Sequence, residues 1–193
     1  MEYLKHIKQF SILSNSELFH LDSLAKEKKY KQNKTLIKQG DIARDLIFLK
    51  SGIVASKYMV KEKIFIRDFY FSPNVFTEQE SFVKQAPAKF SVFSVTDIVC
   101  QTISYDNLDI AYDEIPKLKN IAYDLLIHGF VNISRRLESL LTLNPERRYL
   151  ELLKNNPELL QKIPLKMIAS YLGITDVALS RIRKRISIKK NIS

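Results

Sequence analysis

The feature that most constrains this chain is an apolar row with helical spacing that begins after Ile115-Pro116. Between residues 116 and 142, apolar residues recur every three or four positions, as they do along one face of an α-helix. At about 1.5 Å per residue, this helix is about 40 Å long, which exceeds the diameter of a small domain. The chain therefore has to contain a helix that reaches beyond any single compact unit.

The predicted helix carries more apolar surface than packing onto one domain requires. A second apolar row runs beside the first, through Ile121, Leu126, Ile127 and Phe130. Because surplus apolar surface marks an interaction site, we expect two copies of the helix to pair in a parallel homodimer. The alternative is a helix buried between two domains of a monomer. The expected dimer interface consists of Leu118, Ala122, Leu125, Gly129, Ile133 and Leu137.

The chain before this helix has the pattern of β-strands over residues 29 to 104. Strand-forming runs cover residues 34–38, 46–50, 53–58, 64–70 and 91–103. Gly40 and Gly52 fall between runs, where tight turns favour glycine. Residues 2–24 have helical spacing instead, in short segments. These patterns predict an α+β fold with a compact antiparallel roll or barrel in its N-terminal part.

Asn144-Pro145 ends the long helix, because proline cannot continue a helical hydrogen-bond ladder. Short helices are predicted after this break, over residues 146–154 and 164–172. We therefore expect three parts: an N-terminal unit of residues 1–115, a connecting helix of residues 116–144 and a C-terminal helical unit of residues 145–193.

The charge of the chain is concentrated at its C-terminal end. The formal net charge is +10. Residues 1–144 carry 20 basic and 17 acidic side chains, whereas residues 145–193 carry 11 basic and 4 acidic ones. A basic segment of this kind suits a polyanion such as nucleic acid. No apolar run is long enough to span a bilayer and no signal peptide is evident, so we expect a cytoplasmic protein without a membrane partner.

Residues 164–184 have the pattern of two helices joined by a tight turn. Ala169 is small where the helices would cross, Gly173 suits the turn, and Thr175 is a good N-cap for the second helix. Such a pair can place its second helix in the major groove of DNA. Arg181 is the best candidate for a base contact and Lys166 for a phosphate contact. The predicted DNA-binding residues are Thr175, Asp176, Val177, Ser180, Arg181, Lys184 and Lys166. The alternative is a helical hairpin that serves packing alone.

The residues needed for catalysis or metal binding do not form any recognisable pattern. Cys100 is the single cysteine, too few for a disulfide, a zinc site or an iron–sulfur cluster. His6, His20 and His128 are scattered along the chain. There is no nucleophile elbow and no phosphate-binding glycine loop. We therefore expect a protein that is not an enzyme and carries no metal or cofactor.

Four stretches together resemble the Crp/Fnr superfamily of transcription regulators, in its Bacteroidetes-type members. Residues 34–41 and 46–52 resemble the opening hairpin of the cyclic-nucleotide-binding fold. Residues 139–141 and 145–153 resemble the end of the family's dimerisation helix and the hinge into its DNA-binding domain. Leu172-Gly173-Ile174-Thr175, with residues 179–184, is similar to the family's helix-turn-helix. The resemblance implies a cyclic-nucleotide-binding-like jelly roll as sensor domain, a dimerisation helix and a helix-turn-helix domain that binds double-stranded DNA. It also implies RNA polymerase as a further partner.

The family's nucleotide site is altered in this chain. Members that bind cyclic AMP carry Gly-Glu and then Arg-Ser or Arg-Thr, whereas the matching positions here are Thr77-Glu78 and Lys89-Phe90. Lysine lacks the bidentate fork of arginine, and phenylalanine removes a hydroxyl donor. Thr77, Glu78, Lys89 and Phe90 therefore mark the expected effector pocket, but not one gated by cyclic AMP, and the effector stays unidentified.

The sequence thus predicts a sequence-specific DNA-binding transcription regulator that acts as a homodimer. The alternative function is a small-molecule sensor that acts through protein contacts rather than DNA.

Overall fold

The computed structural model of the chain describes residues 2–155 and 159–190. The strands are β1 (Lys26–Tyr30), β2 (Thr35–Ile37), β3 (Asp45–Ser51), β4 (Ile53–Val60), β5 (Lys63–Phe71), β6 (Asn74–Phe76), β7 (Ser91–Ser94) and β8 (Ile98–Ser104). The 3-10 helices η1 (Glu2–His6) and η2 (Lys8–Ile12) come first. The α-helices are α1 (Asn15–Ser23), α2 (Gln79–Lys84), α3 (Tyr105–Glu114), α4 (Lys117–Thr142), α5 (Pro145–Asn155), α6 (Leu159–Lys162), α7 (Leu165–Tyr171) and α8 (Asp176–Lys190).

The strands form two four-stranded sheets, with the orders β1-β8-β3-β6 and β2-β7-β4-β5. All recorded strand pairings are antiparallel, which confirms the predicted jelly-roll-like architecture. Phe48, Leu49 and Val54 are among the fully buried side chains that fill its core. Gly52 has a φ of +94°, and a Cβ there would lie 2.4 Å from the carbonyl oxygen of Asp97. This turn therefore requires glycine, as the sequence indicates.

Some elements of the fold are not evident from the sequence pattern. The run at residues 91–103 is broken into β7 and β8, and strand β1 has the highly charged sequence Lys-Glu-Lys-Lys-Tyr. β1 is an edge strand, where lysines discourage pairing with other chains. Helices α2 and α3 also lie inside or directly after the predicted β-region. Strand β1 is stabilised by antiparallel pairing with β8 along its whole length rather than by an apolar face of its own.

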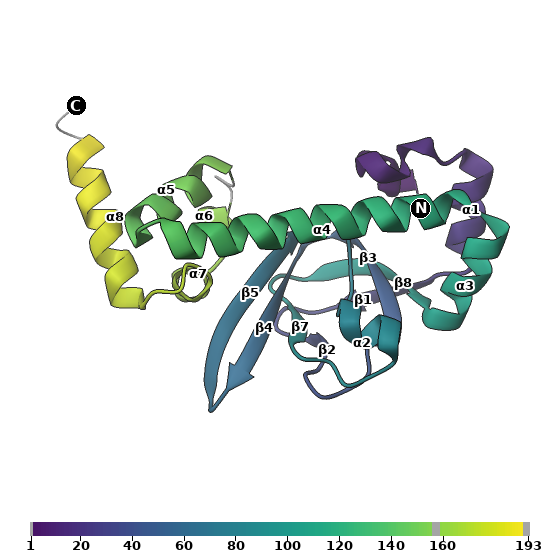
Figure 1. Cartoon of the computed structure of the whole chain (residues 1–193), viewed down its shortest axis with the longest axis horizontal. Helices are drawn as coiled ribbons and strands as arrows, with labels where there is room; N and C mark the ends of the chain where they lie inside the picture. The colour runs from purple at the N-terminus through teal and green to yellow at the C-terminus, as the bar shows by residue number, and fades with distance from the viewer. Residues whose placement is uncertain (1, 156–158, 191–193) are drawn as a thin grey trace.

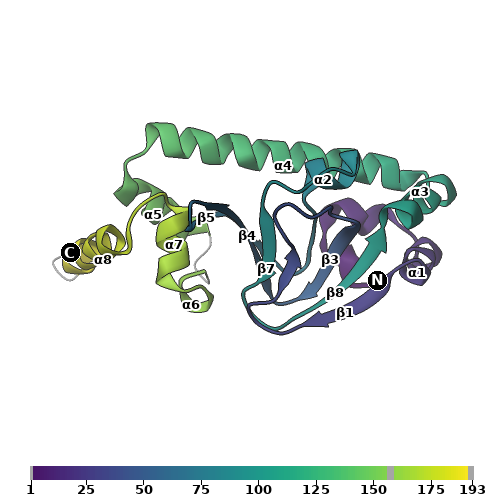
Figure 2. The same cartoon turned by 90° about the horizontal axis from the view of Figure 1, so that it is seen from below.

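Helix α4 confirms the predicted long helix and organises the whole chain. It runs across the molecule, with α1 and α3 at one end and α5 to α8 at the other (Figure 1). Both sheets lie on one side of it (Figure 2). Its first turns are part of the core, because Leu118 and Ile121 are buried against the N-terminal elements.

The apolar core does not divide at Asn144, where the sequence suggests a boundary. One buried cluster combines residues of the second sheet, such as Ile53 and Ile66, with residues of the C-terminal helices, such as Ile168 and Leu179. Helix α7 packs on β5. The C-terminal helices are therefore docked onto the sheet rather than connected to it only through α4.

Within residues 2–155 and 159–190, no helix is long and apolar enough to cross a membrane.

Candidate nucleic-acid interface

Helices α7 and α8 are joined by the turn of residues 172–175, as the sequence predicts. Gly173 has a φ of +70°, and the Ile174 N–H donates to the Ala169 carbonyl at 3.0 Å. The Thr175 hydroxyl accepts from the Ala178 N–H at 3.2 Å, which caps the start of α8. Buried Ile168 and Leu179 hold the two helices together. The turn and the cap thus fix the direction in which α8 leaves α7.

The seven residues predicted to contact DNA are all exposed. Five of them share one side of α8, because positions 176, 177, 180, 181 and 184 lie within one arc of the helix. Lys166 lies on α7. An ion pair of 2.8 Å between Arg185 and Glu146 ties α8 to α5. The structure therefore brings the predicted residues together on a surface where Arg181 and Lys184 have free access to a partner.

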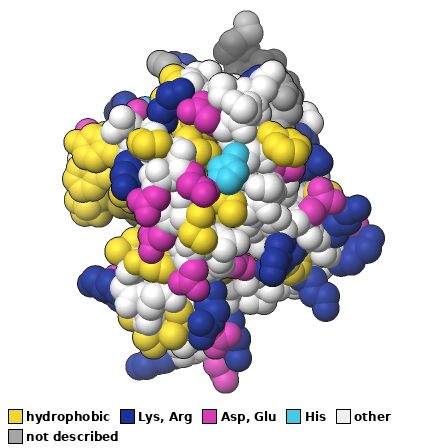
Figure 3. Space-filling view, turned by 90° about the vertical axis from the view of Figure 1, so that its right-hand side faces the viewer, with side chains coloured by type: hydrophobic (Ala, Val, Ile, Leu, Met, Phe, Trp, Pro, Cys, Tyr) yellow, Lys and Arg dark blue, Asp and Glu magenta, His cyan; other side chains and the backbone are white. Residues whose placement is uncertain are grey.

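The end of the molecule that carries α1 and α3, opposite the α8 end, has a surface of mixed charge. There, acidic and basic side chains are interleaved and no large area has a single sign (Figure 3). This mixed surface agrees with the small net charge of residues 1–144.

Helix α4 exposes a continuous apolar stripe, but it is not the row expected from the sequence. The stripe consists of Tyr123, Leu126, Ile127, Phe130, Ile133, Leu137 and Leu141, all exposed. Their spacing repeats every seven residues, as in the seam of a coiled coil. Tyr123, Ile127 and Phe130 lie on the side of α4 away from its buried residues. Ile133 and Leu137 also line the hollow between α4, β5 and the C-terminal helices.

The predicted interface residues divide between the two sides of α4. The assignment of Leu118 to an interface is wrong: it is only 4% exposed and belongs to the chain's own core. Leu125 also packs partly against that core, and Ala122 is half-buried. Gly129 is exposed, and Ile133 and Leu137 belong to the apolar stripe. A straight α-helix turns by about 100° per residue, so rows that look equivalent in sequence can lie on opposite faces.

The matched nucleotide positions Thr77 and Glu78 are engaged within the protein. Glu78 is 2% exposed, and its carboxylate accepts from the Ser81 N–H at 2.6 Å as the N-cap of α2. The Thr77 hydroxyl donates to the Asp45 carbonyl at 3.0 Å. Neither side chain is presented to a ligand in this arrangement.

Lys89 and Phe90 also contact other side chains of the protein. The Lys89 ammonium lies 2.5 Å from the Glu80 carboxylate, and Lys84 lies 3.1 Å from the same group. Hydrogen bonds from these two lysines lower the pKa of Glu80, which stays ionised. Phe90 is 3% exposed, and its ring packs against Tyr58 and under the Arg67 guanidinium. The structure brings the four residues together around α2, where Thr77, Glu78 and Phe90 are buried and Lys89 is exposed but ion-paired.

A larger hollow lies where α4, β5 and the C-terminal helices meet; we call it the junction groove. Its volume is about 830 Å³, and four arginines line it: Arg67, Arg135, Arg136 and Arg148. Arg136 donates to the Tyr171 carbonyl at 2.7 Å and lies 3.7 Å above the Tyr171 ring. Sequence reasoning missed this site, because its arginines come from three elements with no common spacing.

Two further contacts hold α7 against the sheet beside this groove. The Ser170 hydroxyl accepts from the Ile66 N–H at 2.9 Å and donates to the Ile64 carbonyl at 3.1 Å, both on β5. Asp68 lies nearby, and burial raises the pKa of its carboxyl despite the neighbouring Arg67 and Arg136. The junction groove thus has partly buried charges on β5, from Arg67 and Asp68, and on α4, from Arg136.

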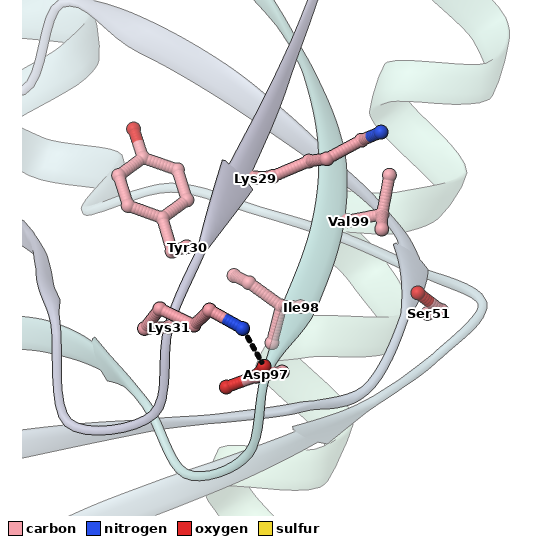
Figure 4. A pocket seen from close by; sticks show the side chains of 7 residues that line it. All are labelled: Lys29, Tyr30, Lys31, Ser51, Asp97, Ile98 and Val99. Carbon is pink, nitrogen blue, oxygen red and sulfur yellow. Dashed lines mark hydrogen bonds and ion pairs between the residues drawn. The ribbon is translucent and has the colours of Figure 1, made fainter.

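A second, smaller pocket of about 290 Å³ lies beside β1 and β8 (Figure 4). The Lys31 ammonium crosses it to the Asp97 carboxylate at 2.8 Å, and Ile98 belongs to the core. Lys31 and Asp97, two charged residues of the lining, are therefore paired with each other.

Cys100 is fully buried in β8, and burial raises the pKa of its thiol to about 11. A thiol with such a pKa is protonated at neutral pH and is a poor nucleophile.

Comparisons with known proteins agree with this architecture. Residues 27–114 match the family of the cyclic nucleotide-binding domain. No curated protein sequence matches the chain. The c-di-GMP-responsive global regulator CLP of Xanthomonas campestris has a similar structure, with a TM-score of 0.77 and 16% identity over 92% of this chain and 93% of CLP.

Two other solved structures have a similar fold. FixK2 of Bradyrhizobium japonicum gives a TM-score of 0.73 at 14% identity, covering 86% of each chain. The catabolite activator protein of Thermus thermophilus gives 0.61 at 19% identity, covering 94% of this chain and 87% of that protein. Residues 27–114 therefore resemble a cyclic nucleotide-binding domain, and the chain as a whole has the same fold as these three proteins.

Proposed function

We propose that this protein is a sequence-specific DNA-binding transcription regulator that acts as a homodimer. The observation that carries the proposal is the exposed side of α8, where Arg181 and Lys184 project from the most basic part of the chain. An arginine on such a helix can donate two parallel hydrogen bonds to a guanine edge. The similarity to structures of known regulators supports this reading.

Dimerisation through α4 is the second part of the proposal. The apolar stripe from Tyr123 to Leu141 has the heptad spacing of a two-stranded coiled coil. Both sheets lie on one side of α4 (Figure 2), and exposed Tyr123, Ile127 and Phe130 lie on the side away from its buried residues. A parallel pair of α4 helices would present two α8 helices to successive major grooves, about 34 Å apart.

We assign residues 1–115 to the sensor domain, residues 116–144 to the dimerisation helix and residues 145–193 to the DNA-binding domain. Cyclic AMP does not gate this regulator, because Glu78 and Lys89 are engaged by protein groups and Phe90 fills the core. As a transcription regulator the protein would act in the cytoplasm, with RNA polymerase as its further partner.

The test is binding of the full-length protein to DNA selected from random duplexes. Fluorescence anisotropy across a salt series should show much tighter binding to the selected sequence than to random duplex. Lys166→Ala should weaken binding to the selected and the random duplex to the same extent. It should also reduce the slope of log affinity against log salt concentration by about one. This variant separates phosphate contacts from base contacts.

The alternative is a sensor that acts through protein contacts. It predicts that no sequence is enriched and that selected and random duplexes bind equally weakly at physiological salt. That result would refute the proposed function.

A further inference from the structure

The outward side of α8 combines one apolar side chain, Val177, with four polar ones. The polar side chains are those of Asp176, Ser180, Arg181 and Lys184. Val177 is 60% exposed, whereas Leu179 and Ile182 are buried on the inner side of the same helix. A single exposed apolar residue is common on protein surfaces, so the position of Val177 has to decide what it does.

The turn before α8 fixes the position of Val177. The Thr175 hydroxyl accepts from the Ala178 N–H at 3.2 Å, and the Leu179 N–H donates to the Thr175 carbonyl at 3.0 Å. Val177 therefore lies in the first turn of α8, and the N-terminal residues of a recognition helix are those that contact base edges. It is two residues before buried Leu179, which places it about 200° away around the helix. Val177 thus projects outward.

Packing within the chain does not account for this valine. Helix α8 lies at one end of the molecule and is farther from the sheets than α7 (Figure 1). The apolar cluster that joins α8 to the other elements includes Leu179, Ile182 and partly buried Ile186, but among the described residues it does not include Val177. Helix formation does not account for it either, because β-branched residues are weaker helix formers than alanine or leucine.

The neighbour of Val177 on this side of α8 is Arg181. The two residues are four apart in sequence, so their side chains are adjacent on the helix surface. They are about 6 Å apart along the helix axis, or about two base-pair steps of about 3.4 Å. Arg181 offers paired N–H donors, whereas Val177 offers two methyl groups and no hydrogen-bonding group. The apolar group that a base pair presents in the major groove is the 5-methyl group of thymine.

We propose that Val177 selects a thymine through its 5-methyl group, within about two base pairs of the guanine that Arg181 contacts. This inference rests on the proposed function, because it concerns a base contact of the DNA-bound protein. A cytosine at the same position would lack the methyl group and would place its amino group against the valine. That amino group would then lose its water without gaining an acceptor, which disfavours cytosine.

Uracil substitution in the selected duplex tests the contact. Uracil keeps the O4 acceptor of thymine and lacks only the methyl group, so each thymine is replaced in turn. At the contacted thymine, uracil should weaken binding of the full-length protein about fourfold per half-site, as expected for one buried methyl-sized group. Uracil at a thymine outside the recognised half-sites gives the baseline. Fluorescence anisotropy measures each affinity.

The Val177→Ala variant assigns the effect to this side chain. It should bind the selected duplex about fourfold more weakly per half-site than the wild type, and uracil at the contacted position should then weaken it by less than about twofold. Leu150→Ala is the matched control, because Leu150 is 42% exposed on α5 and lies outside α8. This control should keep the full response to uracil. Circular dichroism checks that both variants are folded.

Methylated cytosine provides the reverse experiment. A cytosine in place of the contacted thymine should weaken binding, and 5-methylcytosine returns a methyl group to the same place in the major groove. Methylation should therefore recover about fourfold in affinity per half-site for the wild type. For Val177→Ala the recovery should be less than about twofold.

Three results would overturn the proposal. One is a selected duplex in which no thymine within two base pairs of a guanine responds to uracil. Another is a full response to uracil in Val177→Ala, which would mean that a different side chain contacts the methyl group. The third is an equal loss of affinity of Val177→Ala for selected and random duplexes, which would mean that the valine contacts the DNA backbone.

These results differ from a failure of the proposed function. All three are measured on a duplex that selection has already enriched. If no sequence is enriched, the proposed function is refuted and the inference about Val177 is refuted with it. If a sequence is enriched but any of the three results is obtained, only the inference about Val177 is refuted.

Discussion

Truncation of Phe130 is the sharpest test of the apolar stripe on α4. Phe130 lies at the centre of the stripe and is 69% exposed in the single chain. A phenylalanine side chain offers about 200 Å² of surface, so about 140 Å² would become buried on pairing. At about 25 cal/mol per Å², and allowing for the methyl group that alanine retains, Phe130→Ala should cost about 2 kcal/mol per protomer. The dimer contains two copies, so the loss is about 4 kcal/mol, or about a thousandfold in the dimer dissociation constant.

Sedimentation velocity across a concentration series measures this constant. Phe19→Ala is the matched control, because Phe19 is 77% exposed on α1 and lies outside the stripe. It should leave the dissociation constant unchanged. The reasoning is refuted if Phe130→Ala shifts the constant by less than about fivefold, or if both variants shift it equally. A wild-type chain that stays monomeric on DNA would refute it as well.

Other predictions test the remaining parts of the structure. Arg181→Ala should reduce affinity for a selected DNA site by about 1–3 kcal/mol and relax sequence preference, measured by anisotropy against random duplex; an equal loss on both duplexes would mean a phosphate contact instead. Leu118→Ala should lower the free energy of unfolding by about 2–5 kcal/mol in urea without weakening the dimer, because Leu118 lies in the chain's own core. Hydrogen bonds from the Ser14 N–H and Lys117 lower the pKa of Glu17 from 4.5 to about 2. Since the ionised form is favoured in the folded state, this stability is present above pH 4.5 and is lost as the pH falls towards 2. Glu17→Gln should therefore flatten the pH dependence of unfolding in that window, and an unchanged profile would show that the contact is not stabilising.

The sequence by itself determined the order and type of most elements. The helix from residue 117 to 142 was predictable because its apolar spacing persists over seven turns, far longer than chance produces. Most strands and the turn at Gly52 were predictable from alternation and from the need for a positive φ. The α7–α8 pair was predictable because Gly173 and the Thr175 cap are local signals that need no distant partner. Strand β1 was not predictable from the sequence, because its stability comes from pairing with β8 rather than from its own residues.

Only the tertiary structure decided which face each residue occupies. Leu118 and Phe130 belong to the same helix and are both apolar, yet one is in the core and the other is exposed, because the N-terminal elements cover a single side of α4. The four arginines of the junction groove come together only when β5, α4 and α5 are packed. The sequence records which side chains are available along each element, whereas burial and proximity between distant residues depend on how the elements pack.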